Sequence, residues 1–140
     1  MANLIVPYQS MVNWLNAQID DMPTLNDMRL RLFKEPLTVD LATTSAELVA
    51  AEATFPGYVQ QTIVGWTDAI IDDGEALTEA DTATFTASAT NTQQIYGCFA
   101  TSLAGNKLWF AVRFDAAIPT PFGVELQIDI SINLASIFNS

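Results

Sequence analysis

The stretch that most constrains the fold is QIYGCFATSLAGNKLWFAVRF, residues 94–114. Two apolar runs flank the turn-like residues 104–107, and this pattern predicts an antiparallel β-hairpin. A hairpin with one face in water alternates apolar and polar side chains, whereas both faces of this one are mostly apolar. A monomer rarely leaves so much contiguous apolar surface exposed. The second face therefore needs a cover, and we expect it from an N-terminal helix over residues 10–19, from a neighbouring subunit, or from both.

Most of the remaining chain has the two-residue periodicity of β-strands. Met28, Leu30 and Leu32 alternate with Arg29 and Arg31, which predicts a strand whose arginines point outward. Three further segments are predicted as strands, and the last of them alternates most strictly: residues 58–66, 81–90 and 124–134. Residues 67–80 are predicted as an acidic connection, and the proline-containing residues 116–123 as a crossing between strands.

Two short helices are predicted. The first follows Pro7 and Ser10, and its apolar side chains Met11, Trp14, Leu15 and Ile19 share one helical stripe. The second is predicted from Thr44 and Glu47, which have the spacing of a capping box. Many strands with few helices indicate an all-β protein, an antiparallel β-sandwich or jelly roll with an N-terminal helix or arm. We expect the arm over residues 1–23 and the β-sandwich domain over residues 24–140.

The composition excludes several classes of function. The chain has 140 residues, half of them hydrophobic, and a net charge of −11 from sixteen acidic and five basic residues. So acidic a chain repels nucleic-acid backbones and anionic lipids, so we expect no binding to nucleic acid or membrane. The N-terminal residues have neither a basic leader nor a long apolar core, and no apolar run is long enough for a membrane helix, so we expect synthesis and folding in a cytoplasm.

Candidate catalytic groups are scarce. Histidine is absent, which removes the commonest general base and the usual zinc ligand. Cys98 is the single cysteine and lies between Gly97 and Phe99, a setting that favours a small buried core residue over a nucleophile. We expect no enzymatic activity and no cofactor.

Two binding sites remain open from the residues alone. Asp72, Asp73 and Glu75 are weak candidates for calcium ligands, although their spacing does not match an EF-hand and an ordinary solvated connection explains them equally well. Tyr58, Trp66 and Trp109 could form an aromatic platform for a sugar. The alternative, which we favour, is that these rings fill the core.

The motifs LRLFKE, EATFPGYVQQTIVGW, TATFTASATNTQQIYGCFAT and GNKLWFAVRFDAAIP give the chain a resemblance to known proteins. Over about residues 28–134 it resembles a group of small, mostly uncharacterised β-proteins of tailed bacteriophages and prophages. Cys98, Phe110 and the N-terminal helix depart from the pattern of that group. The matching positions are Leu30, Leu32, Phe33, Glu52, Phe55, Gly57, Tyr58, Trp66, Phe85, Ile95, Tyr96, Gly97, Trp109, Arg113 and Phe114.

The resemblance implies a phage-associated β-protein that forms part of a particle. We therefore expect a non-enzymatic virion protein, a capsid decoration or cement protein that self-associates, with trimers as our guess, and contacts the major capsid protein. Its expected contact residues are Trp14, Leu15 and Ile19 on the arm and Trp109, Phe110 and Phe114 on the hairpin. The alternative is a tail-fibre, receptor-binding or neck component, which as a fibre would recognise host-surface glycan through Tyr58, Trp66 or Trp109.

Overall fold

The computed structural model describes residues 4–5, 7–10, 12, 28–68, 70–72, 75–103 and 107–135. The described chain is mostly β, and all its sheets are antiparallel. A five-stranded sheet has the order β1-β8-β7-β2-β3, a three-stranded sheet has the order β10-β5-β4, and β6 pairs with β9. The strands of the first sheet are β1 (Leu4–Ile5), β2 (Arg29–Phe33), β3 (Gln61–Thr62), β7 (Gln94–Thr101) and β8 (Leu108–Pro119). The others are β4 (Ile70–Asp72), β5 (Glu75–Glu79), β6 (Ala83–Thr86), β9 (Glu125–Ile128) and β10 (Ser131–Ala135).

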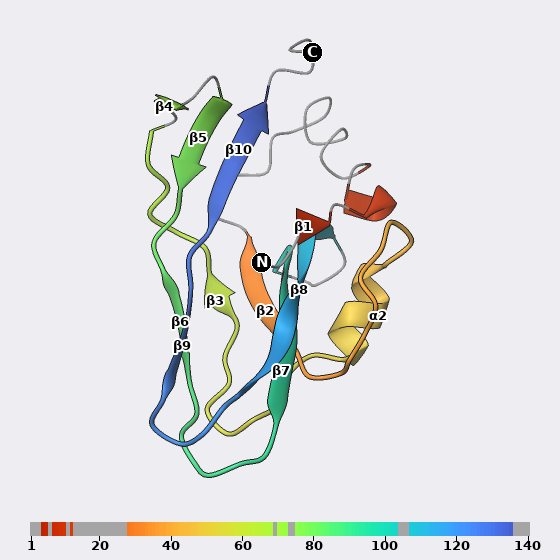
Figure 1. Ribbon diagram of the computed structural model, residues 1–140, viewed down its shortest axis with the longest axis vertical. Coiled ribbons are helices and arrows are strands. Elements are labelled where there is room, and N and C mark those ends of the chain that lie inside the picture. Colours follow the sequence, from red (N-terminus) through yellow and green to blue (C-terminus); the bar gives the residue numbers. More distant parts are fainter. Residues whose placement is uncertain are drawn as a thin grey trace.

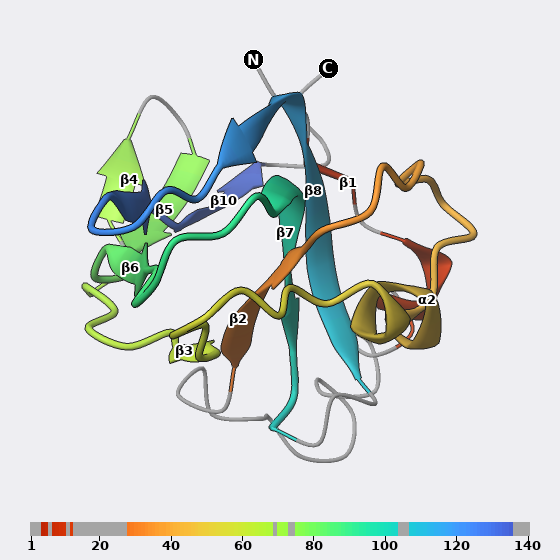
Figure 2. The ribbon, with the colours of Figure 1, turned by 90° about the horizontal axis from the view of Figure 1, so that it is seen from below.

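The expected hairpin is the β7–β8 pair at the centre of the five-stranded sheet, and the chain itself covers its second face. Helix α2 (Ser45–Ala50) lies on one side of this sheet, and the other strands lie on the opposite side (Figures 1 and 2). The cluster beneath α2 is fully buried and consists of Phe33, Leu48, Ala51, Phe99, Leu108 and Ala111. The cover is therefore supplied by α2, a source that the sequence did not suggest.

Helix α2 begins as its sequence predicts. The Thr44 side chain accepts a hydrogen bond from the Glu47 backbone N–H, and the Glu47 side chain accepts one from Thr44, so the capping box is complete. The chain after α2 is tied to β2, where Lys34 N–H donates to Ala51 O at 2.8 Å and Ala53 N–H donates to Leu32 O at 2.8 Å. These bonds hold Leu48 against the hairpin.

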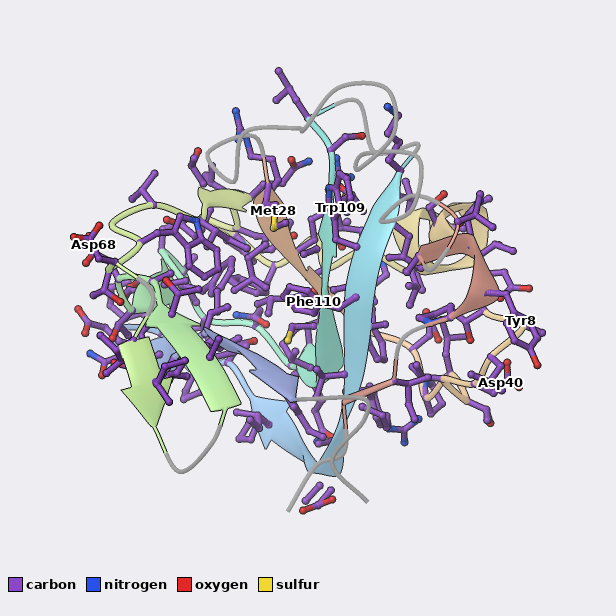
Figure 3. The ribbon with its side chains drawn as sticks, turned by 90° about the horizontal axis from the view of Figure 1, so that it is seen from above. Tyr8, Met28, Asp40, Asp68, Trp109 and Phe110 are labelled. Carbon is purple, nitrogen blue, oxygen red and sulfur yellow. The ribbon has the colours of Figure 1, made fainter. Side chains whose placement is uncertain are left out.

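A β-bulge aims two large rings at the same core. Ala100 pairs with Phe110 and Thr101 pairs with Leu108, so Trp109 is an extra residue in β8. A bulge of this kind places neighbouring side chains on one face. Trp109 is 3% exposed and Phe110 packs partly buried beside it, both on the face opposite α2 (Figure 3).

The second group of strands is one long, kinked antiparallel ribbon. One side of the ribbon is the segment β5–β6 and the other is the segment β9–β10. Strand β5 pairs with β10, and β6 pairs with β9. Ala80 N–H donates to Ile130 O at 3.0 Å across the kink. The prediction of one unbroken strand over residues 124–134 is therefore wrong, since the strand kinks at residues 129–130 so that Ile130 enters the core. Residues 67–80 are also not a plain connection, because β4 and β5 pair there with Asp72 opposite Glu75, leaving only the turn-forming sequence Asp73-Gly74 between them.

Residues 58–66 cross from one group of strands to the other. Only Gln61 and Thr62 pair with β2, after which Ile63 N–H donates to Met28 O while Thr67 N–H donates to Glu79 O in the ribbon. Gly65 lies between these contacts with φ +75, a conformation that interrupts an extended strand. The predicted strand over residues 58–66 is thus shortened to β3.

The described residues near the N-terminus contact the β-domain. Leu4 and Ile5 pair with Val112 and Ala111 of β8. Tyr8 N–H donates to Leu41 O at 2.9 Å, and Ser45 N–H donates to the Gln9 side chain at 2.8 Å. Residues 8–10 and 12 are helical, and the remaining positions of the predicted helix over 10–19 lie outside the described residues.

We predict that Gly97→Ala destabilises the fold. A Cβ at this position would lie 2.2 Å from Val112 O and 2.3 Å from the Phe33 ring, and the backbone oxygen cannot move without breaking the β7–β8 pairing. The expected cost is about 1–3 kcal/mol in the free energy of unfolding, measured by urea denaturation. Thr86→Ala on an exposed position of β6 is the control, expected within about 0.5 kcal/mol of wild type; equal stability of the two variants would contradict the packing.

Candidate functional site

Three side chains and two backbone groups form a hydrogen-bonded network beside β2. Arg31 Nη1 contacts Glu52 Oε1 at 3.3 Å, and the two side chains are only 5% and 18% exposed. The Tyr58 hydroxyl donates to Glu52 Oε2 at 2.8 Å and accepts the Leu32 backbone N–H at 3.1 Å. Arg31 also donates to Leu103 O at 3.4 Å. The Glu52 carboxylate thus joins β2 to the crossing segment, and Arg31 ties the residues after β7 to the same network.

The Tyr58 ring is fixed by packing as well as by these bonds. It lies parallel to the Phe85 ring at a centroid distance of 6.0 Å and edge-on to Phe55 at 5.3 Å. Burial raises the pKa of Tyr58 well above its ordinary value; the Leu32 N–H opposes the shift and Glu52 adds to it. The hydroxyl therefore stays protonated and remains a donor to Glu52.

An open groove of about 620 Å³ adjoins this network. Its polar lining comes from Arg29, Glu52, Thr54, Tyr58 and Gln60, and its apolar lining from Ala53, Phe55, Val59 and Leu103. Within the described residues the groove brings one carboxylate and one guanidinium together with a protonated tyrosine. Within this set, Glu52 and Tyr58 are already hydrogen-bonded to each other.

The predicted aromatic platform is not assembled. Trp109 is buried between the two groups of strands, so it presents no ring face to solvent. Tyr58 and Trp66 are half-buried and both pack against the same core. Of the three predicted glycan contacts, only Tyr58 lines the groove.

The predicted contact residues are divided between the core and the part of the chain that is not described. Trp14, Leu15 and Ile19 lie outside the described residues. Trp109 is buried in the core, so it cannot form part of an exposed hairpin face. Phe110 and Phe114 are half-buried and pack against that core.

Two of the three calcium candidates lie where β4 and β5 pair. Asp72 is the last residue of β4 and pairs with Glu75, the first residue of β5, while Asp73 lies outside the described residues. Among the residues whose side chains are described, no three acidic, cysteine or histidine residues gather where they could hold a metal ion.

Cys98 is a core residue, as predicted. It is 3% exposed and faces the ribbon. Burial raises the pKa of its thiol to about 12, so the thiolate that a nucleophile needs does not form near neutral pH.

Sequence reasoning missed Arg31 and Glu52. Alternation along β2 predicts that Arg31 lies on the face opposite Leu30 and Leu32, and it does. That face is not exposed to solvent, however, because the chain returns at Glu52 and covers it. The available signal was an arginine placed directly between Leu30 and Leu32 and followed by Phe33, since a buried cation requires a carboxylate partner.

Comparison with known proteins gave no relative: no family model, no curated protein and no solved structure matches the chain. In the part of the chain that the structure describes, no helix is both long and apolar enough to cross a membrane. Because no relative is found, the Arg31–Glu52–Tyr58 network and the groove beside it are interpreted from their own geometry.

We predict that Glu52→Ala is strongly destabilising, because it leaves the buried Arg31 guanidinium without its carboxylate. Removing one partner of a buried ion pair costs about 3–5 kcal/mol. Tyr58→Phe is expected to cost about 1–3 kcal/mol, since it removes the partner of the Leu32 N–H and of Glu52. Chemical denaturation measures both, and Glu35→Ala on the exposed surface, expected within about 0.5 kcal/mol of wild type, is the control. A Glu52→Ala variant as stable as this control would contradict the network.

We also predict that Cys98 makes stability fall at alkaline pH. Its pKa is raised from 9.0 to about 12 in the folded protein, so the unfolded chain loses this proton first. The resulting contribution is complete below pH 9 and is lost as the pH rises toward 12, with a limiting slope of about 1.4 kcal/mol per pH unit. Unfolding of wild type and Cys98→Ala, compared from pH 8 to 11, should show the steeper decline in wild type. Parallel curves would show that Cys98 is not buried as described.

Proposed function

We propose that this chain is a non-enzymatic structural protein of a tailed-phage virion, a capsid decoration or cement protein that self-associates on the particle. The observation that carries the proposal is an exposed apolar edge strand, β4. The fold we propose for the whole domain is a β-sandwich of the jelly-roll type, since a five-stranded sheet and a kinked ribbon enclose a common core.

Strand β4 has three properties of a docking strand. It pairs with β5 alone and ends the three-stranded sheet. Ile70 is 60% exposed and Ile71 is 78% exposed. Neighbouring residues of a strand point to opposite faces, so neither face of β4 is covered. An edge of this kind can accept a strand from another protein.

The groups that could perform chemistry are instead used to hold the fold. Glu52 and Tyr58 tie the crossing segment to β2. The Arg113 guanidinium lies 5.2 Å from the centre of the Tyr96 ring and donates to the Leu37 carbonyl. These are contacts that stabilise loops, which supports a structural role over catalysis.

The arm proposed for residues 1–23 would attach each subunit to its neighbour or to the major capsid protein, with Trp14, Leu15 and Ile19 as its contacts. The oligomer proposed is a trimer. The proposed location is the virion, after synthesis in the host cytoplasm.

A second candidate function is a tail-fibre or receptor-binding module. The groove favours it, because Tyr58 lies there among Arg29, Thr54 and Gln60, a mixture of ring and polar groups suited to a sugar. Glycan binding that is lost in Gln60→Ala while particle assembly continues would support this candidate against the first.

We predict that Ile71→Lys weakens binding to capsids at least about tenfold, because a charge replaces an apolar contact. Co-sedimentation of the purified protein with particles that lack it measures this binding. Val64→Lys, at an exposed position away from β4, is the control and should bind like wild type. Equal binding by Ile71→Lys and wild type would exclude β4 as the contact.

Stoichiometry separates the two candidates. Electron microscopy of particles should show many hundreds of copies on the shell if the chain is a decoration protein. A few copies, or a few tens at the tail, would contradict this proposal. Replacing Trp14, Leu15 and Ile19 together by alanine should abolish capsid binding, and a variant that still oligomerises and binds capsids would contradict the arm.

A further inference from the structure

The part of the molecule around β4 carries acidic residues but no basic one. Residues 64–86 include β4, β5 and β6, residues 124–135 include β9 and β10, and neither segment contains a lysine or an arginine. Their acidic residues are Asp68, Asp72, Asp73, Glu75, Glu79, Asp81, Glu125 and Asp129. We call these two segments together the acidic half.

The basic residues all belong to the other half of the molecule. Arg29 and Arg31 lie in β2, Lys34 follows β2, Lys107 precedes β8, and Arg113 lies in β8. Figures 1 and 2 show β2 and β8 between the strands of the acidic half and α2. This asymmetry of charge attracts a cationic partner to the side of the molecule that carries β4.

Acidic side chains of this half face solvent. Asp68, Glu79 and Asp81 are exposed, and Figure 3 shows Asp68 at the rim of the molecule on the same side as β4 and β5. Complementary charge on a partner increases the rate of association and selects against partners of like charge. The exposed carboxylates therefore favour a partner with basic side chains.

Strand β4 also offers main-chain groups for pairing. Asp72 and Glu75 close a two-residue turn, and the closing pair of such a hairpin is hydrogen-bonded across it. Pairs of the two kinds alternate along antiparallel strands, so the next pair, Ile71 with Ala76, is of the non-hydrogen-bonded kind. The N–H and C=O of Ile71 therefore point away from β5, where an added strand can bind them.

The same residue provides an apolar contact. Ile71 is 78% exposed and Ile70 is 60% exposed. Since neighbouring residues point to opposite faces, an added strand could bury apolar surface on either face of β4. The edge thus combines main-chain pairing, apolar contact and surrounding negative charge.

A second copy of this chain does not offer a matching strand in its described residues. The edge strands β1 and β3 of its five-stranded sheet contain no basic residue. Strand β2 has two arginines but lies between β7 and β3, and β8 lies between β1 and β7. The net charge of −11 also makes copies repel one another. The charge distribution therefore selects a different, basic protein at β4.

We propose that β4 binds, as a fourth strand of its sheet, an extended segment of another protein that carries both apolar and basic side chains. The segment pairs with the main chain of Ile71, packs its apolar side chains on Ile70 and Ile71, and places its basic side chains near the carboxylates of the acidic half. This inference rests on the proposed function in taking β4 as the contact surface, and it adds the chemistry of the segment that binds there.

The test uses the purified full-length chain and a fluorescent peptide of about seven residues that alternates valine with lysine. At about 20 mM salt, fluorescence anisotropy should give a dissociation constant near about 100 µM. Peptides with glutamate or threonine in place of lysine should bind at least about tenfold more weakly, because they lack the complementary charge.

Two further measurements locate the contact. A lysine peptide with alternate backbone amides N-methylated should bind at least about tenfold more weakly, because it cannot pair as a strand. Raising salt from about 20 mM to about 300 mM should weaken binding of the lysine peptide at least about threefold, since salt screens the attraction.

Ile71→Lys is expected to weaken peptide binding at least about tenfold, because it removes the apolar contact and adds a repelling charge. Leu41→Lys is the matched control, since it makes the same change of charge at a residue that is 44% exposed and lies outside the acidic half. It should bind the peptide like wild type. Circular dichroism must show that all three proteins are folded.

Four results would overturn the inference: no binding of the lysine peptide at about 1 mM, equal binding of the glutamate peptide, equal binding of the N-methylated peptide, or equal binding by Ile71→Lys and Leu41→Lys. If the peptide does not bind but Ile71→Lys still loses capsid binding, the inference is wrong and the proposed function stands. If the peptide binds at β4 but the chain does not bind capsids, the proposed function is wrong and the inference stands.

Discussion

The fold depends on burial of the β7–β8 pair on both of its faces. One face packs on the ribbon through residues such as Cys98 and Trp109, and the other packs on α2 through Phe99 and Leu108. Each large buried side chain contributes about 1.5–3 kcal/mol of hydrophobic stabilisation relative to exposure. This pair therefore joins the two clusters, and the connections around it are arranged to cover it.

Two local features make this double burial possible. The bulge at Trp109 turns two neighbouring rings toward one cluster. Gly97, which has no side chain, leaves room on the other face for the Phe33 ring. The bulge adds two rings to one cluster, and Gly97 avoids a clash in the other.

The sequence predicted those parts of the fold that depend on local pattern. The alternation around Leu30 and Leu32, the capping box at Thr44 and the central hairpin all have a short-range physical cause, and all three are present. The source of the second cover could not be predicted in this way, because it depends on where the chain returns after β2. The Arg31–Glu52 pair could not be predicted for the same reason, since its members are 21 residues apart and meet only after the chain returns.

The surface divides into regions of different character. The β4–β5 hairpin is acidic in sequence and has an apolar edge, whereas the loop after β8 is held by hydrogen bonds between Thr120 and Asn91 and exposes Phe122. Since the hairpin that first suggested a need for partners is covered within the chain, any association must use such outer surfaces. Self-association would then bury loops and edges and leave the core of each subunit unchanged.

The central claim is that one chain buries both faces of its own β7–β8 pair. Hydrogen exchange of the backbone amides, measured across a hundredfold dilution of the protein, tests this claim most directly. If the chain covers its own central pair, the amides of β7 and β8 will stay strongly protected at every concentration. Loss of protection in β7 and β8 on dilution would contradict the account, because it would mean that a second molecule, and not α2, covers the hairpin.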